Sequence, residues 1–181
     1  MLYVLLAWWL QHHGGVVAGW QAWALVSLAG VSHAVQSNHA EVQRRQYQYW
    51  VYAVPWLRMS HDGDSATAQS WGGGLVSAYL GVASGMTPHA LRIDAAVALA
   101  KRDPARLAQI AAAVHAESPP LLLLCKFLGP NPRAIMLGLS MFAGTPLWYM
   151  LYQSLALNAL LAASVAMHNA AAKRIARQIG A

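Results

Sequence analysis

The sequence predicts an all-α integral membrane protein with about three transmembrane helices, together with interfacial and cytoplasmic amphipathic helices. Two features of composition support this. Hydrophobic residues make up 57% of the 181 residues and charged residues only 10%, whereas soluble domains carry about 45–50% and about 25%. The third observation is the segment 147–167, whose 21 residues carry no charge and are long enough to cross a bilayer. A chain of this length is expected to form a single helical membrane domain.

The first predicted span covers residues 16–35, whose 20 residues would rise about 30 Å as a helix, the thickness of the hydrocarbon layer. Residues 2–10 are expected to form a short helix at the interface, because Gly14 and Gly15 should break the helix that precedes the span. No Lys or Arg comes before this stretch, so the basic n-region of a secretory signal peptide is missing. His12 and His13 are then expected at the water boundary.

Residues 40–118 are predicted to form interfacial and cytoplasmic helices. Within 41–59, arginines are mixed with tyrosine and tryptophan, as in helices that lie on a membrane surface, and Pro55 should end or bend this helix. Further on, Thr87-Pro88 and Asp103-Pro104 each place an N-cap residue before a proline. Amphipathic helices should follow them, the second ending at Ser118-Pro119-Pro120.

Residues 66–86 leave two alternatives open. This segment contains Gly74, Ser77, Gly81 and Gly85, spaced by three or four residues, and small residues at that spacing permit close helix–helix contact in lipid. The segment is therefore a possible additional span. The other interpretation is a glycine-rich loop followed by a short buried helix.

Two more spans are predicted in the C-terminal part. Residues 121–144 are apolar but are broken at 129–132 by the sequence GPNP, so the two pieces must together supply the depth of one crossing. The uncharged segment 147–167 follows directly, and Thr145-Pro146 should cap its helix.

The basic residues predict the orientation of these spans, because Lys and Arg collect on the cytoplasmic side of a membrane. None precedes the first span, whereas Arg44 and Arg45 follow it. We therefore expect a multi-pass protein of the cell (inner or plasma) membrane, with its N-terminus outside and its C-terminus in the cytoplasm. A crossing at 66–86 would place the basic residues of 92–133 outside, so the path through 121–144 and 147–167 is favoured.

Eight histidines raise the question of a haem or metal site. His33 and His168 both lie at the inner ends of predicted spans, so they form the pair that could approach each other and bind a cofactor. The alternative is that both are ordinary polar residues at the interface. His33 and His39 are six positions apart, and on one helix they would face different sides and could not chelate together.

Asp62 and Asp64 are the candidate ligands for a divalent metal such as Mg²⁺. They lie in the loop sequence SHDGDS, so the alternative is a solvated turn. The single cysteine, Cys125, lies in a leucine run; it excludes an internal disulfide and is expected to be an inert buried thiol.

No catalytic residue can be assigned, because the sequence has neither a GxSxG nor a P-loop. The basic residues are scattered, which argues against nucleic-acid binding. The last predicted span does contain polar side chains, and these are expected to hydrogen-bond other helices: Gln153, Ser154, Asn158 and Ser164.

The expected function is that of a small integral membrane subunit or assembly factor of a multi-protein membrane complex. Its partners would be the lipid bilayer and either another membrane protein or a second copy of the chain. The alternative is a membrane-embedded enzyme or electron carrier that uses interfacial histidines to hold haem or a metal.

The sequence QHHGG at 11–15 yields a first prediction. Replacing His12 and His13 with Gln should leave insertion and any chromophore spectrum unchanged, because Gln is also tolerated at the water boundary. Replacing Gly14 and Gly15 with Leu should impair assembly, because residues 2–35 would fuse into one helix of about 50 Å. Membrane fractionation and an absorption spectrum measure both effects. The opposite ranking, with essential histidines and dispensable glycines, would favour ligation of a haem or metal.

Overall fold

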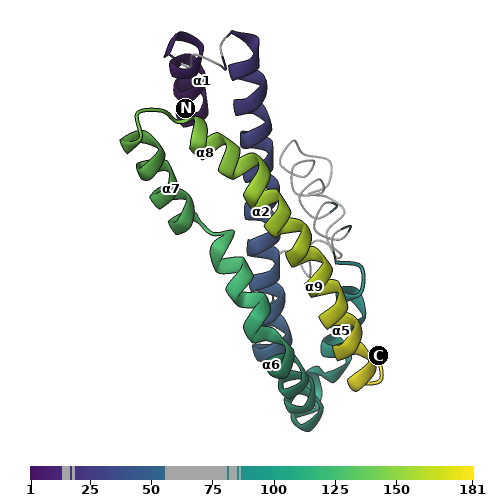
Figure 1. Ribbon diagram of the computed structural model, residues 1–181. Coiled ribbons are helices and arrows are strands. Elements are labelled where there is room, and N and C mark those ends of the chain that lie inside the picture. The colour runs from purple at the N-terminus through teal and green to yellow at the C-terminus, as the bar shows by residue number, and fades with distance from the viewer. Residues whose placement is uncertain (14–16, 18, 56–80, 82–84, 86) are drawn as a thin grey trace. The chain divides into compact units, whose positions relative to one another are not determined.

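The computed structural model describes residues 1–13, 17, 19–55, 81, 85 and 87–181. Within these residues all regular elements are helical and no strand occurs (Figure 1), which confirms an all-α chain. A 3₁₀ turn at Ala100–Arg102 follows α5, and a π-helical turn at Tyr152–Ala156 joins α8 to α9. The α-helices are α1 (Leu2–His13), α2 (Trp20–Tyr52), α5 (Ala90–Leu99), α6 (Pro104–Phe127), α7 (Pro130–Phe142), α8 (Leu147–Leu151) and α9 (Leu157–Gln178).

The chain divides into two compact units. The first contains Met1–Ser37 and Lys126–Ala163, and the second contains Asn38–Cys125 and Ser164–Ala181. The long helices α2 and α9 each contribute residues to both units.

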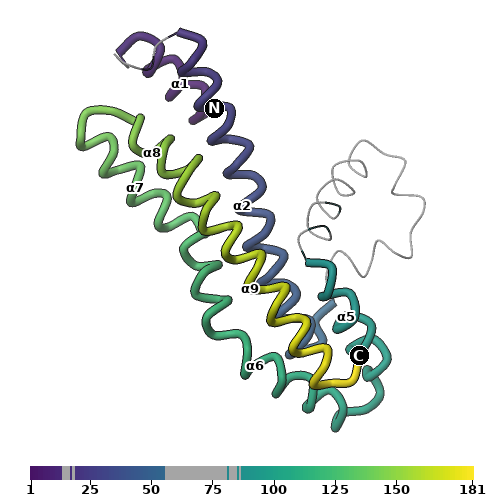
Figure 2. The backbone as a smooth tube through the Cα atoms, turned by 45° about the vertical axis from the view of Figure 1, so that its right-hand side comes forward, coloured from purple at the N-terminus to yellow at the C-terminus, as the bar shows by residue number. Residues whose placement is uncertain are grey.

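In the first unit, α1 and the beginning of α2 form an antiparallel pair, seen as the two purple helices in Figure 2. Near the connection, the indole nitrogen of Trp23 donates a 2.6 Å hydrogen bond to Gln11. At the other end, the rings of Tyr3 and His33 lie 5.9 Å apart. The apolar core that α1 and α2 share with α8 includes Leu6, Ala7, Leu10, Ala22, Val26, Ala29, Tyr149 and Met150.

The second unit has its own apolar core, to which α2, α5, α6 and α9 contribute. Its fully buried side chains include Tyr49 of α2, Ile93 of α5, Ile110 of α6 and Ile175 of α9. Within this unit, the indole nitrogen of Trp50 donates a 2.7 Å hydrogen bond to the carboxylate of the buried Asp94.

Two predicted helix starts are confirmed by their capping contacts. The Asp103 carboxylate accepts a 3.0 Å hydrogen bond from the backbone N–H of Arg106 at the start of α6. The Thr145 hydroxyl accepts a 3.2 Å bond from the N–H of Leu147 at the start of α8. Each side chain therefore satisfies a backbone donor that has no partner inside its helix.

The prediction that a helix ends at Ser118-Pro119-Pro120 is wrong, because α6 continues through both prolines to Phe127. Proline removes a helical hydrogen bond, but Val114, Ser118 and Leu121 are buried on one face. The spacing of four and three residues continues the packed stripe across the prolines. Packing on that face outweighs the local cost of the two prolines.

The boundaries of two other segments also differ from expectation. The sequence predicts separate helices over 16–35 and 41–59, but α2 runs unbroken from Trp20 to Tyr52. A break is expected at 129–132, but α6 ends at Phe127 and α7 begins at Pro130. The helix is therefore interrupted only at residues 128–129. Proline suits the first turn of a helix, where its missing N–H costs nothing.

Two helical stretches, Pro104–Phe142 and Leu147–Gln178, are long and apolar enough to cross a membrane. In the most apolar 18 residues of each stretch, only 22% and 28% of the residues, respectively, are buried within the protein. In the described part of the chain, helix α2 is not apolar enough to count as a membrane-spanning helix, because glutamine, serine and histidine interrupt its apolar residues. The third span at 16–35 therefore stays a prediction. The segment 66–86 lies almost entirely outside the described residues.

Candidate functional site

The residues singled out from the sequence occupy different parts of the chain. Asp62 and Asp64 lie outside the described residues. His33 belongs to the first unit and His168 to the second, and their approach to one another stays a prediction. No group of three His, Cys, Asp or Glu side chains able to hold a metal occurs among the described residues.

A stripe of buried polar side chains runs along α2. Its members repeat at intervals of four and three residues, which places them on one face of the helix. Each is at most 5% exposed. The members are Ser32, Gln36, His39, Gln43 and Gln46.

In the first unit, Gln36 is the centre of a hydrogen-bond network. Its amide nitrogen donates to the side chain of Asn158 at 2.7 Å and to the backbone carbonyl of Gln153 at 3.1 Å. Its amide oxygen accepts a 2.6 Å bond from the side chain of Gln153. Asn158 in turn donates to the hydroxyl of Ser32 at 2.8 Å. These contacts connect α2 to α9 and to the turn that precedes it.

Arg133 of α7 joins the same network and is only 4% exposed. Its guanidinium donates to the hydroxyl of Ser37 at 2.6 Å, to the amide oxygen of Gln36 at 3.1 Å and to Nδ1 of His33 at 3.3 Å. Because a guanidinium can only donate, His33 accepts through Nδ1 and carries its ring proton on Nε2. In the described part of the chain no carboxylate contacts Arg133, so its positive charge is shielded by neutral groups alone.

A π-helical turn positions Gln153 for this network. Residues Tyr152–Ala156 adopt the π conformation, which rotates the side chains of the turn relative to a regular α-helix. Gln153 lies inside this turn and is completely buried. Such turns are rare and occur often at functional sites, so the turn marks this network as a candidate site.

A second polar cluster, the His39–Ser164–His168 cluster, lies in the second unit. Nε2 of His39 lies 2.9 Å from the hydroxyl of Ser164, and that hydroxyl lies 3.2 Å from Nδ1 of His168. The two imidazole rings are 5.4 Å apart and almost perpendicular. The thiol of Cys125 lies 4.0 Å from Nε2 of His168. Sequence reasoning missed His39 as the neighbour of His168.

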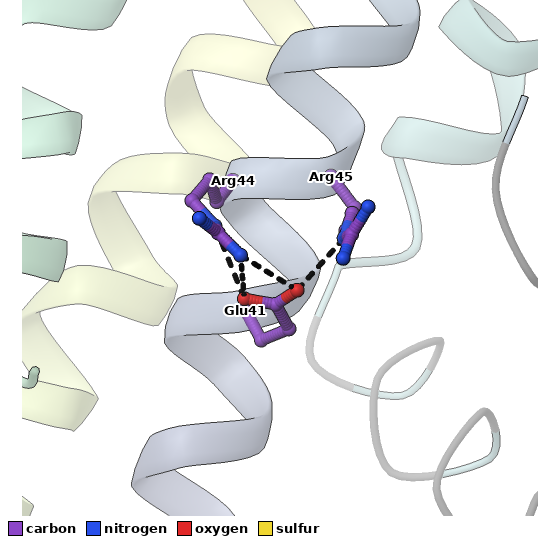
Figure 3. A network of polar contacts seen from close by, with 3 residues as sticks. All are labelled: Glu41, Arg44 and Arg45. Atoms are coloured by element: carbon purple, nitrogen blue, oxygen red, sulfur yellow. Dashed lines mark hydrogen bonds and ion pairs between the residues drawn. The ribbon is translucent and has the colours of Figure 1, made fainter. Parts of the chain in front are cut away.

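The basic side chains on the exposed face of α2 form a separate feature. Glu41 accepts hydrogen bonds from both Arg44 and Arg45, at distances down to 2.8 and 2.7 Å (Figure 3). Exposed ion pairs of this kind contribute little to stability. The group keeps a net charge of +1, since one carboxylate faces two arginines.

His12 and His13 make only local contacts among the described residues. Nδ1 of His12 lies 2.8 Å from the carbonyl of Trp8, and Nδ1 of His13 lies 3.2 Å from the carbonyl of Trp9. Both side chains are exposed at the end of α1. Each is therefore bonded to its own helix four residues back.

No protein family, curated protein or solved structure matches this chain. The function must therefore be inferred from the chemistry of these two buried clusters and of the surface around them.

The hydrogen bonds of Asn158 lead to a second prediction. Asn158→Leu should lower the stability of the folded chain by about 0.6 kcal/mol, the average for hydrogen bonds between helices in lipid. The amide contacts α2 of the same chain, so the loss should appear in unfolding of the monomer. Steric trapping or denaturant unfolding in bicelles measures it. Asn131→Leu, at an exposed asparagine of α7, is the matched control and should change stability less. Equal effects at both positions would contradict the network.

Proposed function

We propose that this protein is a small integral membrane subunit or assembly factor of a multi-protein membrane complex. One observation carries the proposal: in the first unit several polar side chains are completely buried beside the apolar core, while other large apolar side chains on the same helices are exposed. Gln36 and Gln153 are completely buried, whereas Val31 is 65% and Ile135 64% exposed. In proteins that fold in water, glutamine is mostly exposed.

The buried polar groups fit a protein whose surroundings are lipid. A polar group that faces hydrocarbon without a partner costs several kcal/mol. Charged side chains within membrane segments almost always face the interior of the bundle. Arg133, on the apolar stretch Pro104–Phe142, follows this rule by directing its guanidinium to Gln36 and Ser37.

The exposed faces of the same helices offer an apolar surface for lipid or for another helix. On α9 four alanines repeat at intervals of four and three residues, and all are exposed: Ala159, Ala163, Ala166 and Ala170. Small residues at this spacing let the backbones of two membrane helices approach closely. We infer that this stripe contacts a partner helix, from another membrane protein or from a second copy.

The proposal includes the orientation inferred from the charges. The N-terminus lies outside and the C-terminus in the cytoplasm, so Arg44 and Arg45 face anionic lipid headgroups. Glu41 pairs with both arginines, but the preference for the cytoplasmic side counts Lys and Arg and depends little on carboxylates.

Leu155 gives a third prediction, one that separates lipid from water. This side chain is 65% exposed near the middle of the uncharged segment. In lipid, Leu155→Lys should cost about 2.5–3.5 kcal/mol and reduce the fraction that stays in the membrane after carbonate extraction. In water the same change would be nearly neutral, within about 0.5 kcal/mol.

The matched control for that experiment is Leu99→Lys. Leu99 is 88% exposed at the end of α5, outside the proposed spans, and should accept lysine in either case. If Leu155→Lys left the membrane fraction as high as Leu99→Lys does, integration of this segment in lipid would be refuted.

A fourth prediction concerns the partner. Ala163→Leu should prevent close approach at the alanine stripe, and a tagged chain cross-linked in native membranes should then co-purify with less of its partner by quantitative mass spectrometry. Ala98→Leu changes an exposed alanine of α5 and should have no such effect. Undiminished co-purification with Ala163→Leu would remove the stripe as the contact surface.

A further inference from the structure

Cys125 and His168 bring a thiol and an imidazole nitrogen together in the second unit. The sulfur of Cys125, on α6, lies 4.0 Å from Nε2 of His168, on α9, and both residues belong to this unit. His168 is only 7% exposed, whereas Cys125 is half-buried. The imidazole is therefore enclosed by the protein, and Cys125 retains some access from outside.

The hydrogen bonds of His168 leave one of its ring nitrogens available as a ligand. Nδ1 lies 2.8 Å from the backbone carbonyl of Ser164. Because a carbonyl oxygen can only accept, Nδ1 carries the ring proton, and Nε2 of the neutral ring has a lone pair. That lone pair faces the Cys125 sulfur. Since a thiol is only a weak hydrogen-bond donor, the lone pair has no strong partner in the described part of the chain.

The bond to the Ser164 carbonyl is also one that metal-binding histidines make. Such a histidine almost always donates its second ring N–H to a carboxylate, a backbone carbonyl or water, which fixes the ring and makes the other nitrogen more basic. His12 and His13 contact the carbonyls of their own helix in the same way. Only at His168 does the single cysteine of the chain face the other nitrogen.

The separation of the sulfur and the nitrogen fits a metal ion between them. Zinc forms bonds of about 2.3 Å to sulfur and about 2.0 Å to imidazole nitrogen, so an ion with bonds of this length can join two such atoms up to about 4.3 Å apart. The 4.0 Å between Cys125 and His168 lies within this limit. Neither side chain therefore has to move far to bind a shared ion.

We propose that Cys125 and His168 bind a monovalent soft metal ion, Cu(I). Thiolate selects soft ions such as Cu(I) and Zn²⁺, and imidazole binds both metals. Zinc sites use three or four protein ligands, whereas Cu(I) also forms complexes with two. Among the described residues no group of three His, Cys, Asp or Glu side chains is placed to hold a metal. The small number of ligands therefore favours copper.

The charge of the complex also favours a monovalent ion. On binding, the Cys125 thiol gives its proton to bulk water, and Cu(I) bonds to the thiolate sulfur and to the lone pair of Nε2 while its previous ligand is released. Nothing is oxidised or reduced. Thiolate and Cu(I) together are neutral, whereas Zn²⁺ would leave one positive charge. In the described residues no carboxylate contacts the pair, and an unpaired buried charge is expensive.

The experiment titrates the purified full chain with Cu(I), without oxygen, against a chromogenic Cu(I) chelator. The unchanged chain should take one equivalent of copper from the chelator, and Cys125→Ala and His168→Gln should each lose that equivalent. The matched control is His39→Gln, which changes the neighbouring buried histidine that contacts Ser164 and should retain it. Full uptake by Cys125→Ala, or equal loss in His39→Gln, would refute the assignment.

A second measurement needs no substitution, so it stays decisive even if a variant fails to fold. X-ray absorption of the copper-loaded unchanged chain should show Cu(I) with one sulfur and one nitrogen neighbour. A first shell of nitrogen and oxygen alone would overturn the site.

Metal competition tests the charge argument. Ag(I), which is also soft and monovalent, should displace the copper, and excess Zn²⁺ should not. Displacement by Zn²⁺ would contradict selection of a monovalent ion. All these measurements concern the second unit alone, so their outcome does not depend on the proposed membrane function.

Discussion

Gln36 uses every hydrogen-bonding position of its side chain. Its oxygen accepts from Gln153 and Arg133, and its nitrogen donates to Asn158 and to a backbone carbonyl, which is the full complement of a carboxamide. One completely buried side chain on α2 thereby binds residues from α7, the π-helical turn and α9. An unpaired amide at such a position would be costly both in an apolar core and in lipid. The arrangement of the first unit follows from the need to satisfy it.

Arg133 imposes a second constraint on the first unit. Its side chain is buried and positively charged, and no carboxylate among the described residues contacts it. Guanidinium groups stay protonated in proteins, and burial of an unpaired charge is expensive. Hydrogen bonds to Ser37, Gln36 and His33 distribute the charge over neutral oxygen and nitrogen atoms. Its Nε has no partner, so the shielding is incomplete. The network is thus held by a group that is itself costly to bury, which is common at functional sites and rare in purely structural packing.

The sequence predicted the helical class and several helix starts, because these depend on local chemistry. Asp103 caps its helix as the dipeptide Asp103-Pro104 implied. The continuation of α6 through Pro119 and Pro120 was not predictable, since it depends on packing of Val114 against residues distant in the sequence. The expectation that Asn158 bonds another helix is confirmed.

The burial of Arg133 was missed because a lone basic residue near a helix start is normally exposed. The polar residues of α2 repeat at intervals of four and three, and this spacing indicates that Gln36 and His39 lie on one buried face. Only a search for periodicity among polar residues would have detected it.

The polar stripe on α2 has the spacing that coiled coils use for apolar residues. Apolar side chains on such a face tolerate sliding, because one hydrophobic contact replaces another at similar cost. Amides and imidazoles do not, since a shift of one turn would leave several donors and acceptors without partners. A buried polar residue in a helical seam is known to fix register at a cost in stability. The stripe from Ser32 to Gln46 places several such buried polar residues along α2. Gln36 hydrogen-bonds to Asn158 in one unit, and His39 hydrogen-bonds to Ser164 in the other. Because the pairing is specified by these buried polar side chains, alanines and leucines can occupy the exposed faces of the same helices without affecting the register.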